Sequence, residues 1–175
     1  MHFSEEQRHV LKIERNANGE IIFMSPSFPH ISKFIAKISF EVFLWNKKLK
    51  TGDVFDSSAG FTLPNKAVRS PDISWLSKEK WDLAMTDEAN KRRFPHVVPE
   101  FVIEVKSDSD SLKQQKEKME EWMVNGCLLS WLIDYQGEKV FIYKKDGSID
   151  EKSYDDALTG ENILPGFSLR IKDIL

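Results

Sequence analysis

The sequence predicts an α/β fold in which a central mixed β-sheet carries a helix on each face and follows an N-terminal β-hairpin. Two observations predict these layers. Apolar residues repeat at helical spacing from about residue 30 to residue 50, and a β-branched and aromatic run at 101–106 precedes a second helical segment and further apolar runs. A strand, a helix and a strand in that order form a right-handed parallel crossover. The 175 residues suffice for one hydrophobic core, so we expect a single domain spanning residues 1–175.

The hairpin and the first helix open the chain. Residues 13–15 and 20–24 flank an Asn-Gly dipeptide, which is typical of a tight turn between paired strands. From about residue 30 to residue 50, apolar residues form one stripe of a helix. Phe40 and Phe43 lie off this stripe. We therefore expect the helix to bury a second face, either in the core or in a dimer contact.

The second helix follows the 101–106 strand. Ser109 or Ser111 can cap its first turn, and Gly126 ends it. A polar segment at residues 77–96 precedes that strand and is expected to cross the surface, with a helical turn around Glu79-Lys80-Trp81. The remaining strands are expected at residues 54–56, 59–63, 73–76, 129–133 and 139–143.

Composition excludes several classes of protein. Hydrophobic residues make up 41% of the chain and charged residues 30%, as in an ordinary soluble globular protein. Charged residues interrupt every apolar run well before the roughly 18 residues of a membrane-spanning helix. The chain starts with polar and acidic residues rather than with the basic and apolar residues of a secretion signal. We therefore expect a cytoplasmic protein with no membrane partner.

The chain has one cysteine, Cys127, which excludes internal disulfides and zinc clusters held by several thiolates. Its apolar neighbours predict a buried core residue. No two histidines stand at zinc-ligand spacing, which disfavours a zinc hydrolase. His30 could contact a substrate or lie beside a helix cap, and His96 is expected in a loop.

The most informative functional signal joins Pro71-Asp72 to Glu104-Val105-Lys106. Side chains alternate between the two faces of a strand, so Glu104 and Lys106 point to one face and Val105 points to the other. Charges inside an apolar strand usually mark an ion pair, a metal or a site, because an unpaired buried charge costs on the order of several kcal/mol. The alternative is a strand that leaves the core, with both charges in water. Asp72 on an earlier strand favours a site that holds a divalent metal beside a cation.

With Asp72 on one strand and Glu104-x-Lys106 on the next, the chain resembles the PD-(D/E)xK nuclease superfamily. More narrowly, it resembles the Uma-type putative restriction endonucleases over nearly its whole length. This resemblance implies a restriction-endonuclease-like fold, with a central mixed sheet flanked by helices. The matching strings are Arg15, Gly19-Glu20-Ile21-Ile22-Phe23-Met24-Ser25-Pro26, Leu44-Trp45-Asn46, Val54-Phe55-Asp56-Ser57-Ser58-Ala59-Gly60-Phe61, Arg69-Ser70-Pro71-Asp72, Phe101-Val102-Ile103-Glu104, Ser109-Asp110-Ser111-Leu112, Glu117-Lys118-Met119, Trp131-Leu132-Ile133-Asp134 and Leu164-Pro165-Gly166-Phe167.

The resemblance implies an endodeoxyribonuclease that uses Mg²⁺ or Mn²⁺. Asp72 and Glu104 would hold the metal, with the backbone carbonyl of Val105 as a third ligand, and such hard oxygen donors suit Mg²⁺. Lys106 would orient the attacking water or stabilise the transition state. Cutting duplex DNA needs two active sites, so we expect a homodimer.

Further residues are candidates for supporting roles. Related nucleases often add an acid from the first helix, and Glu41 lies at the edge of that helix's apolar stripe. Glu41 could equally be a solvated acid, and Glu20 in the hairpin is a rival. Gln115 lies on the inward stripe of the second helix and could hold a water or a phosphate. Lys118, one turn on, matches a recurring family position, although both residues could instead lie at the boundary of the core.

DNA binding needs local positive charge, because contacts to phosphate dominate affinity. The net charge of −3 does not favour DNA binding by the chain as a whole. Two clusters of basic residues could contact DNA, although a cluster of this size is usually a solvated face. They contain Lys47, Lys48, Lys91, Arg92 and Arg93.

Two other functions stay open from the sequence. The chain could be a catalytically inactive nuclease-fold domain that binds nucleic acid or protein. It could also be a metal-dependent hydrolase of another substrate.

Overall fold

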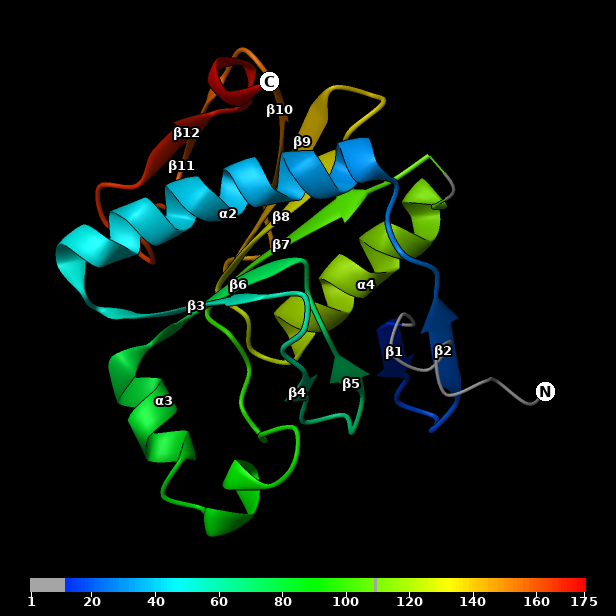
Figure 1. Cartoon of the computed structure of the whole chain (residues 1–175), viewed down its shortest axis with the longest axis vertical. Helices are drawn as coiled ribbons and strands as arrows, with labels where there is room; N and C mark the ends of the chain where they lie inside the picture. The colour runs from blue at the N-terminus through cyan, green and yellow to red at the C-terminus, as the bar shows by residue number, and fades with distance from the viewer. Residues whose placement is uncertain (1–11, 109) are drawn as a thin grey trace.

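A six-stranded mixed β-sheet forms the centre of the computed structural model, which describes residues 12–108 and 110–175. One long helix crosses one face of this sheet, and a shorter helix covers the other face (Figure 1). The helices are α2 (Pro29–Leu49), α3 (Lys78–Ala84) and α4 (Leu112–Val124), with the 3₁₀ helices η1 (Glu88–Lys91) and η2 (Ile171–Ile174). The strands are β1 (Lys12–Arg15), β2 (Ile21–Met24), β3 (Gly52–Asp56), β4 (Phe61–Thr62), β5 (Val68–Arg69), β6 (Ile73–Ser77), β7 (Phe101–Lys106), β8 (Leu129–Asp134), β9 (Lys139–Lys144), β10 (Ile149–Ser153), β11 (Ala157–Thr159) and β12 (Ser168–Arg170).

The central sheet has the strand order β10-β9-β8-β7-β6-β3. β7 and β8 are parallel and α4 connects them, whereas the other neighbouring pairs in this sheet are antiparallel. The hairpin β1–β2 belongs to a separate antiparallel sheet with the order β2-β1-β5-β4, and β11 pairs with β12. The predicted α/β class, the parallel crossover and the N-terminal hairpin are therefore confirmed.

Two apolar layers hold the helices to the sheet. The alternation along β7 contributes to both, since Phe101, Ile103 and Val105 belong to the layer under α2 and Val102 belongs to the layer under α4. Phe101 and Ile103 are fully buried, and burying a side chain of this size stabilises the fold by roughly 1.5–3 kcal/mol. The sheet is thus packed on both faces, which fixes the positions of Glu104 and Lys106 on β7 and of Asp72, which directly precedes β6.

The long helices begin and end close to where the sequence predicts. Ser111 caps α4, since its hydroxyl accepts a hydrogen bond from the backbone N–H of Gln114 (3.5 Å). Gly126 follows α4 with a φ of +108°, in the left-handed region that favours glycine. Pro29 occupies the first turn of α2, where its missing N–H leaves no hydrogen bond unmade.

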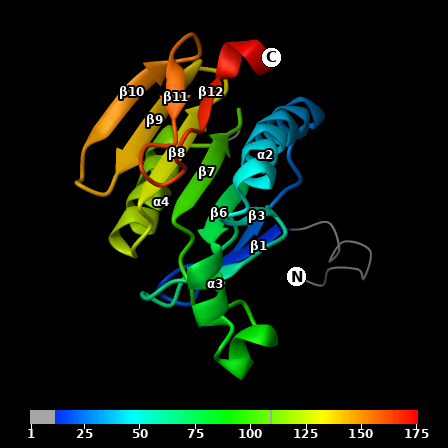
Figure 2. The same ribbon diagram turned by 90° about the vertical axis from the view of Figure 1, so that its left-hand side faces the viewer.

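The structure adds elements that the sequence pattern does not predict. The second apolar face of α2 is not buried in the core, because Phe40 and Phe43 are 59% and 56% exposed; a dimer contact there stays a prediction. Residues 77–96 contain α3, where the sequence predicts a helical turn, and in addition η1; both lie beyond the end of the sheet (Figure 2). The C-terminal strands β10 to β12 are also additional, and β10 lies at the sheet edge with alternating exposure rather than an apolar run.

Cys127 lies in the apolar layer under α4, as predicted, and is 2% exposed. Its thiol donates to the backbone carbonyl of Leu129 (3.2 Å). Within the described ranges, none of the helices has the length and hydropathy needed to span a bilayer.

Candidate active site

A cavity of about 710 Å³ lies where the hairpin, the start of α2, the end of β7 and the start of α4 meet. It brings together residues that are far apart in the sequence. Its lining contains Lys12, Phe23, Met24, Ser25, Pro26, Ser27, Phe28, Ser32, Ile35, Ser57, Asp72, Glu104, Val105, Ser107, Asp110, Gln115 and Lys118. Of the residues that the sequence singles out, Asp72, Glu104, Val105, Gln115 and Lys118 therefore share one cavity.

Asp72 immediately precedes β6 and faces the end of β7. In the antiparallel pairing of these strands, Ile73 lies opposite Ile103, which places Asp72 beside Glu104 on the neighbouring strand. The backbone N–H of Val105 donates to Asp72 Oδ2 (2.9 Å). The Lys12 ammonium, from β1, lies 3.3 Å from Asp72 Oδ1. Asp72 is thus oriented by the sheet and paired with a cation from the hairpin.

Glu104 is 3% exposed and points to the α4 side of β7. Its Oε1 lies 2.8 Å from the Lys118 ammonium and accepts a hydrogen bond from the indole N–H of Trp122 (3.2 Å). Burial raises the pKa of Glu104, because loss of water disfavours the carboxylate more than Lys118 favours it. A buried carboxylate with a raised pKa beside a cation in a cavity is typical of functional sites.

Lys118 joins two buried acids. It projects from α4, and its ammonium lies 2.8 Å from Glu104 Oε1 and 3.0 Å from Glu14 Oε1. Burial alone would lower the pKa of Lys118, but the two carboxylates overcome this effect and raise the pKa above its ordinary value. The ammonium therefore stays charged in the fold, beside Glu104 in the lining of the cavity.

Glu14 is an acid that sequence reasoning missed. It lies on the inward face of β1 and is 2% exposed. Besides Lys118, it accepts from Arg69 (3.0 Å) and from the backbone N–H of Ser70 (3.0 Å). Burial alone would raise the pKa of Glu14, but Lys118 and the N–H of Ser70 lower it below its ordinary value. The sequence offers one signal for this residue, because Glu14 is an acid between Ile13 and Arg15 on a short strand. Side chains alternate between the two faces of a strand, so Glu14 points to the face opposite that of both neighbours.

Lys106 lies apart from Lys118 although it shares a face with Glu104. Its ammonium is 3.2 Å from Asp134, the residue directly beside it on the parallel strand β8. Both side chains are nearly buried. Among the described residues that line the cavity, Val105 and Ser107 are present and Lys106 is not. The alternation along β7 is as predicted, but the two charged heads turn to different partners.

The supporting candidates divide between the cavity and the surface. Glu41 lines a separate hollow between α2 and the C-terminus, with Lys37 and Asp173. Glu20 is exposed and accepts a hydrogen bond from Asn16 in the hairpin turn. Gln115 lines the cavity, and its Oε1 is buried without a hydrogen-bond partner in the described part of the chain. An orphaned buried acceptor of this kind is typical of a place that a ligand or water completes.

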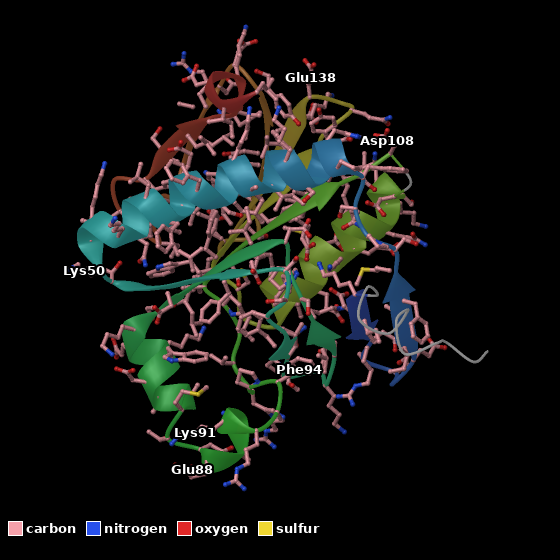
Figure 3. The ribbon with its side chains drawn as sticks, in the orientation of Figure 1. Lys50, Glu88, Lys91, Phe94, Asp108 and Glu138 are labelled. Atoms are coloured by element: carbon pink, nitrogen blue, oxygen red, sulfur yellow. The ribbon has the colours of Figure 1, made fainter. Side chains whose placement is uncertain are left out.

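The basic residues predicted to bind DNA lie away from the cavity. Lys47 and Lys48 are exposed in the last turn of α2, whereas the cavity meets its first turns. Figure 3 shows Lys50 at one end of α2 and Asp108, which follows the cavity-lining Ser107, near the other end. In η1 and the turn after it, Lys91 pairs with Glu88, Arg93 pairs with Asp87, and Arg92 ends the helix. The structure therefore does not join these cations to the acids of the site.

The donor set of the cavity fits a Mg²⁺-type ion. In residues 12–108 and 110–175, no three His, Cys, Asp or Glu side chains lie close enough together to hold one metal ion. Mg²⁺ does not need such a cage, because it is commonly held by one or two carboxylates together with waters and substrate phosphate oxygens. Asp72 and Glu104 supply two carboxylates on the wall that also contains Val105.

Comparison with known proteins places the chain in a family. Residues 3–172 match the model of the Uma2 family, described as a putative restriction endonuclease. The crystal structure of a putative nuclease belonging to DUF820 from Anabaena variabilis is similar with a TM-score of 0.76 and 19% identity, over 93% of this chain and 88% of that one. No curated protein matches the chain. The similar structure supports the fold alone, and the family match over nearly the whole length shows that the chain belongs to the Uma2 family of putative restriction endonucleases.

Proposed function

We propose that this chain is a metal-dependent endodeoxyribonuclease whose site is built from Asp72, Glu104 and Lys118. The observation that carries the proposal is the ammonium of Lys118 held 2.8 Å from the buried Glu104 carboxylate, in the cavity that Asp72 also lines. Two acids that can hold a metal ion and a buried cation around one cavity are groups that can catalyse phosphodiester hydrolysis. Membership of the Uma2 family supports the same reaction class.

Asp72 and Glu104 would hold Mg²⁺ or Mn²⁺, with the carbonyl of Val105 as a third oxygen. When bound, the metal would polarise the phosphate and lower the pKa of a coordinated water. Lys118 and Trp122 both contact Oε1 of Glu104, so we assign the coordination of the metal to Oε2. Asp72 would exchange its ion pair with Lys12 for the metal.

The remaining side chains of the cavity would position the reactants. Lys118 would orient the attacking water and stabilise the negative charge of the transition state, because its ammonium is charged and held in place by two acids. Gln115 Oε1, a buried acceptor, would receive a hydrogen bond from that water. The sequence assigns the role of the cation to Lys106, but its pairing with Asp134 favours Lys118.

Nuclease assays test this proposal. Purified protein is incubated with supercoiled plasmid and with circular single-stranded DNA, with Mg²⁺, with Mn²⁺ and with a chelator. We expect metal-dependent cleavage, and we expect Asp72→Asn and Glu104→Gln each to abolish it. Lys47→Met, a change at the far end of α2, should leave cleavage intact. Cleavage that survives Asp72→Asn and Glu104→Gln would refute the site, and an absence of cleavage on both DNAs would refute the nuclease.

One observation favours a non-catalytic domain as the second candidate. Lys12 lies 3.3 Å from Asp72 and Lys118 lies 2.8 Å from Glu104, so each of the two acids already has a cationic partner within the protein. In that case the chain would bind nucleic acid or protein and would not cut it. Binding of DNA with equal affinity in metal and in chelator, without cleavage, would support this candidate.

A further inference from the structure

The lining of the candidate cavity contains two chemically different groups of side chains. One group is charged, with Lys12, Asp72, Glu104 and Lys118, and the other is apolar. A nucleotide has the same division, because its phosphate is charged and its base offers a flat stacking face. The volume of about 710 Å³ falls within the range of roughly 300–1,000 Å³ for small-molecule pockets. The apolar group contains Phe23, Met24, Pro26, Phe28 and Ile35.

Phe28 is an aromatic residue of this group whose ring is oriented by a neighbouring ring. It lies in the connection between β2 and α2, it lines the cavity, and it is 52% exposed. Its ring stacks on His30, with 5.8 Å between the ring centroids and 12° between the planes. His30 lies in turn 5.6 Å from the ring of Tyr135. A half-exposed ring oriented by a neighbouring ring offers a base a surface that needs no reordering.

The basic residues that the sequence predicts to bind DNA do not line the cavity. Lys47 and Lys48 lie at the opposite end of α2 from Phe28, and Lys91 and Arg93 are paired with acids of their own segment. Binding to a duplex depends mainly on many cations that neutralise phosphates. Binding to a single strand also draws on base–aromatic stacking, which is independent of sequence.

We propose that the cavity takes an unpaired nucleotide of single-stranded DNA, with its base stacked on Phe28 and its phosphate directed to Asp72, Glu104 and Lys118. This inference rests on the proposed function and names the form of DNA on which that site acts. In a duplex the bases are stacked on one another, so they cannot reach Phe28 without leaving the helix. A single strand needs only one active site for each cut.

Fluorescence anisotropy tests the base subsite without relying on cleavage. The probes are fluorescein-labelled oligothymidylate, the same strand annealed to oligodeoxyadenylate, and oligouridylate of equal length, all in Ca²⁺. The variants are Phe28→Ala, Phe28→Trp as the aromatic replacement, and Phe40→Ala as the matched control on an exposed phenylalanine outside this cavity. Thermal melting shows whether each variant is folded.

We expect the single strand to bind at least about tenfold more tightly than the duplex, and Phe28→Ala to weaken it about tenfold. Phe28→Trp should retain the affinity, and Phe40→Ala should not change it. The proposal is overturned if the duplex binds as tightly as the single strand, if Phe28→Ala binds like the wild type, or if oligouridylate binds more tightly than oligothymidylate. A protein that shows the expected binding but cuts no DNA refutes the proposed nuclease activity and supports the base subsite. Cleavage confined to duplex DNA supports the nuclease activity and refutes the base subsite.

Discussion

The Lys118 ammonium lies 2.8 Å from the Glu104 carboxylate, although Lys118 comes from α4 and Glu104 from β7. Lys106, only two residues from Glu104, lies instead 3.2 Å from Asp134. The lysine nearest in sequence is therefore not the lysine that contacts the acid. The reason is geometric. A strand directs alternate side chains to one face, but it does not determine which neighbouring strand or helix each charged group contacts.

Replacing Glu14 should destabilise the fold. Glu14→Gln removes the charge that pairs with Lys118 and Arg69 in a buried position, so we expect a loss of about 3 kcal/mol in the free energy of unfolding. Urea denaturation measures this loss, with Glu20→Gln as the control on an exposed acid of the same hairpin. A loss no larger than that of the control would contradict the role of Glu14.

The same variant has a defined pH dependence. The folded-state pKa of Glu14 is lowered, so its contribution is fully present above the ordinary value of 4.5 and is lost as the pH falls through the lowered pKa. Wild type and Glu14→Gln should therefore differ in stability at neutral pH and converge in acid. Denaturation midpoints that stay equally far apart at all pH values would show that the effect is not electrostatic.

Replacing Glu104 should have the opposite effect on stability. Its folded-state pKa is raised, so the folded protein binds the proton more tightly and loses stability as the pH rises from the ordinary value of 4.5 through the raised pKa. Glu104→Gln keeps the shape without the charge, so it should melt at the same temperature as the wild type or higher at neutral pH. It should also lose cleavage. A strongly destabilised Glu104→Gln would show that the buried carboxylate is structural.

Replacing Lys12 should strengthen metal binding. Its ammonium lies 3.3 Å from Asp72 Oδ1, where it competes with a cation for the carboxylate. Removing that charge with Lys12→Met should raise the affinity for Mn²⁺ by roughly three- to tenfold, since two like charges at this range repel by about 1 kcal/mol even in water. Calorimetric titration measures the affinity, with Lys47→Met as the control. An unchanged or weaker affinity would place the metal away from Asp72.

Much of the fold is predictable because its elements follow simple periods. The stripe of α2, the cap at Ser111 and the apolar run of β7 each depend on local residues, and each agrees with the structure. β10 could not be predicted in the same way, because it is a polar edge strand held by pairing with β9.

The residues of the site differ in the same way, since some follow from local sequence patterns and others depend on long-range packing. Asp72 and Glu104 are predictable because each is a charge at an apolar strand, and the antiparallel pairing of β6 with β7 brings them together. The contact of Glu14 with Lys118 spans 104 residues and joins β1 to α4. Such a contact depends on how the small N-terminal sheet packs against α4 and the central sheet, and no local pattern in the sequence predicts this packing.

Single-turnover cleavage of circular single-stranded DNA by wild type, Lys118→Met and Lys106→Met is the most direct measurement of the site. The ammonium of Lys118 contacts the acid that would hold the metal, whereas that of Lys106 is paired with Asp134. We expect Lys118→Met to slow cleavage by about 10²–10³-fold at saturating metal, as expected for the loss of one charged group that stabilises a transition state. Lys106→Met should cut within about tenfold of the wild-type rate but should be less stable, because Asp134 is left buried without its partner. A Lys118→Met variant that cuts at the wild-type rate, or a Lys106→Met variant that is folded and inactive, would contradict the assignment.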